Sequence, residues 1–433
     1  MHRRLFNTSL LVGFFFGLDK IIGLGRQVLV AGTFGLSADF DAFNVANNLP
    51  DTLVSLLSGG ALAFVLVPVL TETLDQKGQA KAWELFSYIV NLAFVITAVI
   101  AAVIALFPLP LVRYVLAPQF SPAQQALVAE LMRLNLISAL IFSVSGLVMS
   151  ALQAHQHFLF PALAPIVYHL GQIFGVLVLR RFGIHGLAYG VILGAAAHLA
   201  VQIPGLVRYQ FHWTPRLTLV EAGVRRVLSL LGPRLITIGF INLVFIFNDR
   251  FASGLGEGVI SALYYGWNIM QLPETVIGTA AGTVLLPTLS ELAARGEALE
   301  LKRILRRALG VLLLLTVPVA VLGIALIRPA IALTLEGRVF TPAESELVAL
   351  ATQMFLIGLA GHSLKEIAAR TFYAYQDVRT PLFTSALTLA LFISFSLLLL
   401  PRLGFAALAL ANSLAFTVEA LLMLFILYRR RIL

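Results

Sequence analysis

The sequence predicts an all-α polytopic membrane protein with about twelve transmembrane helices in two six-helix lobes that repeat in parallel. Three observations support this fold class. Hydrophobic residues make up 59% of the 433 residues and charged residues only 12%, which is more apolar surface than a water-soluble fold can hide. About twelve segments are long and apolar enough to cross a bilayer. Motifs of the first half recur about 220 residues later.

The expected spans are read from segments of ~20 mostly apolar residues, the length that crosses the hydrocarbon core. The second and eighth are longer, and Pro50 and Pro273 near their starts allow each helix to kink. The spans are expected near residues 8–33, 41–70, 86–107, 131–152, 161–179, 186–206, 227–248, 259–289, 308–327, 347–372, 381–400 and 405–427.

The net charge of +9 is interpreted through membrane topology rather than nucleic-acid binding, and we expect no nucleic-acid partner. Lysine and arginine are concentrated at the two ends of the chain and in the loops that join even-numbered to odd-numbered spans. Cytoplasmic loops carry such an excess, and each basic residue near anionic lipid contributes about 1 kcal/mol. Both termini are therefore predicted to be cytoplasmic.

The repeat is clearest in two loops, "AHQHFLFP" (154–161) and "AYQDVRTP" (374–381). "FSPA" (120–123) likewise matches "FTPA" (340–343). These matches predict an N-terminal lobe over 1–210, a cytoplasmic linker over 211–226 and a C-terminal lobe over 227–433. Because six is even, both copies enter the membrane from the same side, as in transporters that bind substrate between their lobes. The alternative is a duplicated scaffold without transport.

Charged residues inside the first two spans are the first candidate site. A charge at mid-membrane costs at least ~2.5–3.5 kcal/mol, so it needs a partner or a water-filled cavity. The first span carries Asp19, Lys20 and Arg26, and we interpret Asp41 as the counter-charge of Lys20 or Arg26. The group is either the wall of a substrate cavity or a salt-bridge cluster that joins two helices. The polar residues at the start of the second span are Asp41, Asn44, Asn47 and Asn48.

The tenth span carries a second group of charges. Glu366 stands four residues from both His362 and Arg370, so these side chains share a helix face. Lys365 is a candidate for substrate binding, and the alternative is a snorkelling cluster at the end of the helix. His362 and Glu366 lack a third ligand, so we expect no metal site. Two acids in other spans are candidates for ion coupling: Glu274, which could also serve a helix start, and Glu419.

Motifs for covalent chemistry are absent from the sequence. It contains no cysteine, no P-loop, no GxSxG and no HExxH, so we expect neither an enzyme nor a cofactor, and no ATP-driven pump. A secondary transporter or a flippase remains.

Four stretches resemble the MurJ/MviN family of lipid II flippases: "GLGRQVLVAGTFGLSADFDAFNVANNLP" (23–50), "FVLVPVL" (64–70), "GTAAGTVLLPTLS" (278–290) and "KEIAARTFYAYQDVRTP" (365–381). The resemblance implies the multidrug/oligosaccharidyl-lipid/polysaccharide exporter fold, with V-shaped lobes around a cationic central cavity. It also implies a monomer in the bacterial cytoplasmic (inner) membrane, among membrane lipids and beside cell-wall synthesis enzymes. The implied activity is the transfer of an undecaprenyl-pyrophosphate-linked precursor, lipid II first, from the inner to the outer leaflet by alternating access, for peptidoglycan synthesis.

The resemblance also implies roles for individual residues. Arg26 matches a functional arginine, Lys20 replaces another, and Asp41 matches an acid at the start of the second helix. Val54 and Ser55 stand where the family carries paired arginines, and Asn268 replaces a further arginine. The resulting cavity is less cationic and richer in amides, namely Asn44, Asn47, Asn48 and Asn268 beside Trp267. This keeps open a flippase for another lipid-linked glycan, such as an O-antigen or capsule unit, a non-transporting scaffold for cell-wall enzymes, and a drug exporter by analogy of fold.

Overall fold

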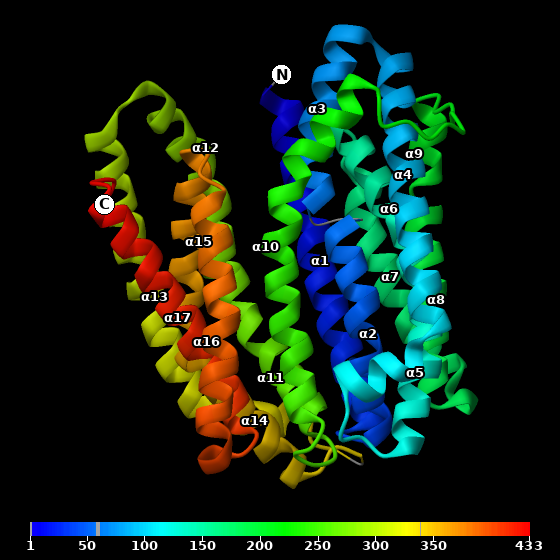
Figure 1. Ribbon diagram of the computed structural model, residues 1–433, viewed down its shortest axis with the longest axis vertical. Helices are drawn as coiled ribbons and strands as arrows, with labels where there is room; N and C mark the ends of the chain where they lie inside the picture. The colour runs from blue at the N-terminus through cyan, green and yellow to red at the C-terminus, as the bar shows by residue number, and fades with distance from the viewer. Residues whose placement is uncertain (1, 58–60, 338) are drawn as a thin grey trace. The chain divides into compact units, whose positions relative to one another are not determined.

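The computed structural model describes the backbone of residues 2–57, 61–337 and 339–433, and their side chains except those of 2–13, 61, 63–64 and 233. Throughout this part of the chain, the regular elements are helices (Figure 1). Their apolar composition explains this, because a helix satisfies its own backbone hydrogen bonds in lipid.

The helices of the first half are α1 (His2–Phe34), α2 (Ala38–Leu57), α3 (Ala61–Lys77), α4 (Gln79–Leu106), α5 (Pro108–Leu111), the π-helical turn η1 (Val112–Leu116), α6 (Pro122–Ala154), α7 (Leu159–Val178), the 3₁₀ turn η2 (Arg180–Phe182), α8 (Ile184–Ala200) and α9 (Ile203–Arg208). Those of the second half are α10 (Ala222–Ala252), α11 (Val259–Glu274), the π-helical turn η3 (Thr275–Thr279), α12 (Ala280–Arg295), α13 (Ala298–Thr334), α14 (Pro342–Ile357), α15 (Leu359–Ala374), α16 (Arg379–Leu403) and α17 (Ala406–Arg429).

Most of the expected spans coincide with long apolar helices. Among the described residues, 9 helices are long and apolar enough to cross a membrane, or 10 if α14 and α15, bent by 44° at their junction, form one span. The expected spans over 8–33 and 41–70 are not in that set. α1 covers the first, and the three charges within residues 8–33, namely Asp19, Lys20 and Arg26, lower the hydropathy of that span. The second is divided between α2 and α3, and residues 58–60 between them lie outside the described part.

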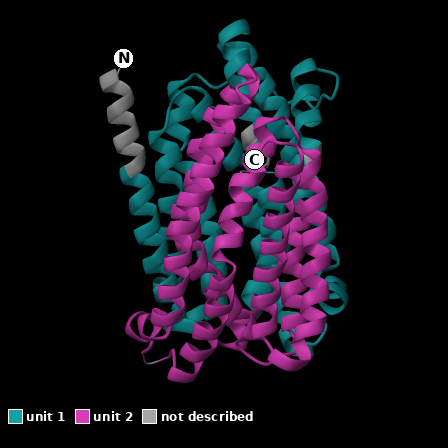
Figure 2. Ribbon diagram, turned by 90° about the vertical axis from the view of Figure 1, so that its left-hand side faces the viewer, with its two compact units in different colours: residues 1–34, 42–238 teal, residues 35–41, 239–433 magenta. Residues whose placement is uncertain are grey.

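The chain divides into two compact units (Figure 2). One comprises Met1–Phe34 and Ala42–Ile238, and the other comprises Gly35–Asp41 and Gly239–Leu433. The short segment before Asp41 thus belongs with the second half of the chain. The lobe boundaries expected at 210 and 227 stay a prediction.

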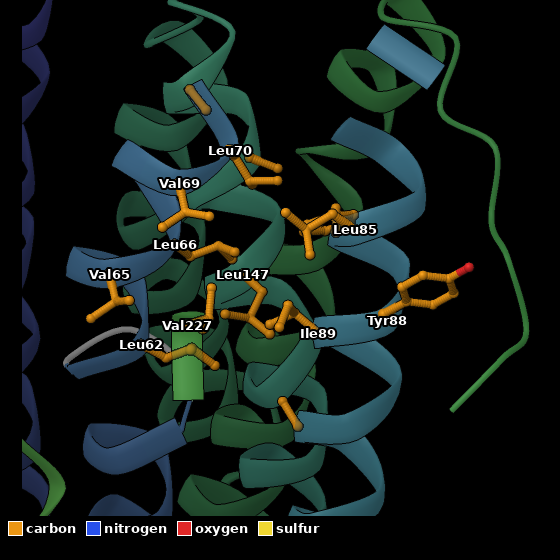
Figure 3. Packing of buried hydrophobic residues seen from close by; sticks show 14 of the residues in the cluster. Leu62, Val65, Leu66, Val69, Leu70, Leu85, Tyr88, Ile89, Leu147 and Val227 are labelled. Carbon is orange, nitrogen blue, oxygen red and sulfur yellow. The ribbon is translucent and has the colours of Figure 1, made fainter. Parts of the chain in front are cut away.

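The core of the first unit lies among α3, α4, α6 and the start of α10. Figure 3 shows Leu66, Ile89, Leu147 and Val227 from these four helices packed against one another. Each of these side chains is at least 98% buried, so the cluster is a dry core that fixes the four helices as one body.

A seam of glycines joins α7 to α8 in the same unit. A Cβ on Gly171 would lie 2.3 Å from the Cα of Gly194, and one on Gly175 would lie 2.6 Å from the Cα of Gly190. Only glycine permits this backbone approach, which is how membrane helices gain van der Waals contact when lipid gives them no hydrophobic drive to associate.

The second unit is centred on α15 and α17. Ile367 and Phe372 of α15 pack against Ala420 and Met423 of α17 in a buried cluster. The helices approach closely beside it, because a Cβ on Gly361 would meet the Thr417 hydroxyl at 2.3 Å. This approach brings the polar side chains of α15 within reach of α17.

The predicted repeat is confirmed in the local geometry of the two matching loops. Gln156 and Gln376 both have φ of 59°, a left-handed conformation that is uncommon outside glycine. The N–H of the next residue closes the preceding helix in each copy, from His157 to the Leu152 carbonyl and from Asp377 to the Phe372 carbonyl, both at 2.9 Å. Both loops are therefore the same Schellman-type helix end.

Candidate functional site

The polar side chains of α1 meet α7 within the first unit. The Arg26 guanidinium donates a hydrogen bond from Nη1 to Oε1 of Gln172 at 2.6 Å. Gln172 is buried and uncharged, so it orients the guanidinium and leaves its positive charge uncompensated by this contact. A cation held in this way is available to an anionic ligand.

Asp19 is the acid that lies beside Lys20. Its Oδ2 is 3.8 Å from the Lys20 Nζ, and its Oδ1 is 3.4 Å from Nε2 of His169 on α7. Gly23 leaves room for this ring, since a Cβ there would come within 3.2 Å of the His169 Nε2. The Lys20 ammonium is half exposed and also lies 5.2 Å from the Phe16 ring centroid. One carboxylate is thus shared between a lysine and a histidine.

Asp41 is buried and caps the start of α11 within the second unit. Its Oδ2 accepts from the Gly258 N–H at 2.6 Å, and its Oδ1 accepts from the Ser261 N–H at 2.7 Å and the Ser261 hydroxyl at 2.6 Å. A carboxylate at a helix N-terminus satisfies backbone donors and complements the helix dipole. Because both oxygens are used there, the counter-charge role expected for Asp41 needs correction: Asp19 pairs with Lys20, and Gln172 with Arg26.

The amides of α2 form a half-buried row. Asn47 accepts at Oδ1 from Nδ2 of Asn135 on α6 at 2.8 Å, and its own Nδ2 donates to the Phe43 carbonyl at 3.0 Å. Asn44 and Asn48 flank it on the same helix, one turn apart and half-buried. The row places amide groups on one stretch of α2, where they suit hydroxyl-bearing ligands.

The second unit holds an ion pair between α15 and α17. The Lys365 Nζ lies 3.7 Å from Oε2 of Glu419, and the Glu419 side chain is only 1% exposed. The ammonium also lies 4.5 Å from the centroid of the Phe416 ring. Neither Glu419 oxygen makes a hydrogen bond within the described residues. Glu419, which has no partner nearby in sequence, is therefore held by a single long ionic contact.

His362 of α15 is enclosed by neutral partners from α17 and α11. Its Nε2 lies 3.1 Å from Oδ1 of Asn412, and its ring stacks on Phe416 with centroids 4.3 Å apart. Trp267 contacts the same histidine edge-on at 5.4 Å and also packs against Phe355. The histidine and the tryptophan therefore form part of a packed aromatic group.

Glu274 stands at the junction of α11 and η3. Both of its carboxylate oxygens lie near the Thr279 hydroxyl, at 3.2 and 3.3 Å. The predicted pairing of Glu366 with Arg370 is confirmed at 3.4 Å. Asn268, one turn before the Leu272–Pro273 bond, donates from Nδ2 to the Tyr264 carbonyl of its own helix at 2.7 Å. A π-helical turn beside a half-buried acid is a frequent mark of a functional position.

The partners that come from distant helices are not among the residues predicted from the sequence. Gln172 and His169 lie about 150 residues from the charges they contact, and Asn412 lies 50 residues from His362. A usable signal existed on α7, where His169 and Gln172 are spaced i, i+3 within an apolar helix.

Comparisons with known proteins identify the family of the chain. A family model described as "Lipid II flippase MurJ" matches residues 30–433. The lipid II flippase MurJ of Burkholderia cenocepacia is 29% identical over 99% of this chain and 84% of its own. A probable lipid II flippase MurJ of Rhizobium tropici is 29% identical over 95% of this chain and 79% of its own.

Solved structures show the same fold. A lipid II flippase MurJ in an inward closed conformation superposes with a TM-score of 0.83 at 22% identity, over 98% of this chain and 89% of that one. An inward-facing multidrug resistance MATE family transporter of the MOP superfamily gives 0.81 at 13% identity, over 96% and 94%. The expected fold class is confirmed, and the family match over residues 30–433 shows that the chain belongs to the lipid II flippase MurJ family.

Proposed function

We propose that the chain moves an undecaprenyl-pyrophosphate-linked cell-wall precursor, lipid II first, from the inner to the outer leaflet of the cytoplasmic membrane. The observation that carries this proposal is the family match across residues 30–433, together with relatives named as lipid II flippases over nearly the whole chain. The protein acts as a monomeric transporter, with both termini in the cytoplasm, and catalyses no covalent step.

The cations of the two units supply the chemistry that a diphosphate needs. Arg26 is oriented by a neutral amide, Lys20 shares one carboxylate with His169, and Lys365 has one long ionic contact. A diphosphate competes well for such cations, because charge-assisted hydrogen bonds strengthen where the dielectric is low. The half-buried amides of Asn44, Asn48 and Asn268 bind the sugar hydroxyls.

Transport follows from neutralising those charges. Arg26, Lys20 and Lys365 capture the head group from the cytoplasmic side, and charge compensation allows the lobes to close and reopen outward. Glu419 is the first candidate for ion coupling, because its carboxylate is buried, lacks hydrogen bonds within the described residues and faces a substrate-binding lysine. Glu274 is the second, and Asp41 supports the site by fixing the start of α11.

A second candidate function is transfer of another lipid-linked glycan, such as an O-antigen or capsule unit. It is favoured by Val54, Ser55 and Asn268, which stand where the resemblance to the family calls for arginines. A cavity with fewer cations and more amides binds sugars relatively better than diphosphate.

Complementation separates the two candidates. The full chain is expressed in a bacterium depleted of its own lipid II flippase, with the amount in the membrane measured in parallel. Rescue of growth supports lipid II as substrate. No rescue at a matched protein level contradicts it, and rescue of an O-antigen or capsule flippase mutant would then identify the second function.

Arg26 gives the test at the site. Arg26→Ala is expected to abolish rescue, a loss of at least tenfold in transport rate, because it removes the charge that Gln172 orients. Arg26→Lys keeps the charge without the planar fork and should retain part of the rate. Full transport by a correctly inserted Arg26→Ala protein would remove Arg26 from the substrate site.

A further inference from the structure

An apolar groove lies between α12 and α13 in the second unit. Its volume is about 390 Å³. It is open along one side, where Val284 is 75% and Val311 49% exposed. The lining residues are Ile277, Ala281, Val284, Leu285, Ile304, Arg307, Ala308, Val311, Leu312 and Leu315.

The α13 wall is one continuous helix face. Its members recur at intervals of three and four residues from Ile304 to Leu315, as one stripe of a helix must. From Arg307 to Leu315 the stripe extends ~12 Å at 1.5 Å per residue. One leaflet contributes roughly half of the ~30 Å hydrocarbon core. The groove below Arg307 therefore has the depth of one leaflet.

Arg307 is the one charged residue in this lining, and it marks the end of the apolar stretch of α13. The first turns of α13 also carry Lys302, Arg303 and Arg306. Arg303 is paired with Glu300 at 2.7 Å. Within the described chain, no ion pair joins Lys302, Arg306 or Arg307 to an acid. The mouth of the groove thus has a positive charge that the protein leaves uncompensated.

We propose that this groove binds an anionic phospholipid of the surrounding bilayer, with one acyl chain against the α12–α13 stripe and the phosphate on Arg307. The apolar walls suit the chain, and the basic end of α13 favours an anionic over a zwitterionic head group. The short α12–α13 connection (Figure 1) keeps the two walls together at this end. This site is independent of the substrate that the protein transports.

The test is lipid binding to the purified full-length protein, measured by native mass spectrometry during titration with phosphatidylglycerol or phosphatidylcholine of identical acyl chains. Phosphatidylglycerol should bind the wild type more tightly. Arg307→Gln should weaken phosphatidylglycerol binding about fivefold, as expected for one basic residue near an anionic head group, and leave phosphatidylcholine unchanged. Val284→Trp, which fills the groove from its exposed side, should weaken both.

Arg303→Gln is the matched control, because it makes the same charge change one turn away at a side chain paired with Glu300. It should leave phosphatidylglycerol binding unchanged. Equal binding of the two lipids, or equal effects of Arg307→Gln and Arg303→Gln, would overturn the site. So would loss of polyprenyl diphosphate binding in Val284→Trp with phosphatidylglycerol binding intact, since the groove would then belong to the transported lipid. Thermal unfolding of each variant confirms that it is folded.

Discussion

The Lys365–Glu419 pair shows how one residue can be structural and functional at once. Its charges lie in apolar surroundings, where breaking a buried pair leaves an uncompensated ion and costs ~3–5 kcal/mol. The carboxylate makes no hydrogen bond within the described residues to offset that cost. The pair is therefore stable only while both charges are present, or while another ion replaces one of them.

Glu419→Gln should destabilise the protein by about 3 kcal/mol, because it leaves the Lys365 ammonium without its counter-ion. The measurement is thermal unfolding in detergent micelles. The double variant Lys365→Met/Glu419→Gln should recover most of the loss. Glu300→Gln breaks an exposed pair and should cost less than ~1 kcal/mol. Equal losses of stability in Glu419→Gln and Glu300→Gln would show that burial of the Lys365–Glu419 pair does not change its contribution to stability.

Asp377 gives a pH dependence at a loop outside the spans. Burial acts to raise the pKa of this carboxyl, but hydrogen bonds from Thr380 and Arg430 outweigh it and lower the pKa from 3.8 to about 2. Since the folded-state pKa lies below the ordinary value, the stabilisation is present above pH 4 and lost as pH falls toward 2.

The destabilisation caused by Asp377→Asn should therefore shrink as pH falls from 4 to 2. Solvent screening limits the effect to ~1 kcal/mol at neutral pH. Thermal unfolding of both proteins across this range, under detergent conditions that keep the fold at low pH, checks the sign. A difference that grows on acidification would contradict the assigned hydrogen bonds.

At this scale the sequence indicates which residues are unusual but not what they contact. Charges in an apolar helix stand out because lipid penalises them. Their partners depend on which helices pack together, and so Asp19 was noticed while His169, 150 residues later, was missed. Asp41 was expected to meet a cation and instead caps α11, since backbone N–H groups are invisible in a pattern of side-chain charges.

Elements are where prediction works best, because apolar length directly determines a membrane helix. α7 lies within two residues of its expected bounds, and α4, α6 and α13 contain nearly all of their expected spans but begin seven to ten residues earlier. A kink in the eighth span is expected at Pro273, and η3 follows that proline directly, whereas the 44° bend between α14 and α15 is not expected from the sequence. Apolar length alone does not indicate where that bend lies.

The α7–α8 seam yields a prediction about helix packing. Gly194→Ala should destabilise the protein by ~1–3 kcal/mol, because its Cβ would lie 2.5 Å from the Tyr168 carbonyl oxygen. Gly310→Ala is the control: a Cβ there meets nothing within 4 Å, so only the helix propensity changes, by up to ~1 kcal/mol in favour of folding. Equal thermal unfolding midpoints for the two variants would mean that the seam tolerates a methyl group.

At the scale of the whole molecule, the connection between α9 and α10 is fastened along α4. Four α4 side chains, spaced four residues apart, bond the backbone of residues 209–216. Trp83 donates to the Tyr209 carbonyl at 2.8 Å, and Asn91 donates to those of Thr214 and Arg216 at 2.8 and 3.1 Å. Gln79 also donates to the Tyr209 carbonyl, and Ser87 donates to the His212 carbonyl. The expected linker is thus held as a strap on the first unit.

Asn91→Ala should free the end of this strap, because it removes both bonds to the strap and the acceptor of the Trp213 Nε1. Trypsin should then cleave after Arg216 several-fold faster, with the rate followed by mass spectrometry of the fragments. Ser394→Ala removes only a bond within its own exposed helix and should not change this rate. An unaltered cleavage rate in Asn91→Ala would mean that the hydrogen bonds of Gln79, Trp83 and Ser87 are enough to hold this segment.

The duplication was predictable at this scale because matching loops preserve residues that a helix end requires, as Gln156 and Gln376 do. The grouping of residues 35–41 with the second unit was not predictable, since neither hydropathy nor charge distinguishes these residues from the helices on each side.

The Asp41 cap has a consequence for synthesis. Asp41 leaves the ribosome some 220 residues before Ser261, and at 5–20 residues per second that interval is roughly 10 to 40 s. During this interval α11 has not been synthesised, so the Asp41 carboxylate lacks the N–H groups that it binds in the folded protein. The second unit therefore cannot be completed from residues 239–433 alone, and a polypeptide cut between residues 41 and 239 should assemble only when both pieces are made together.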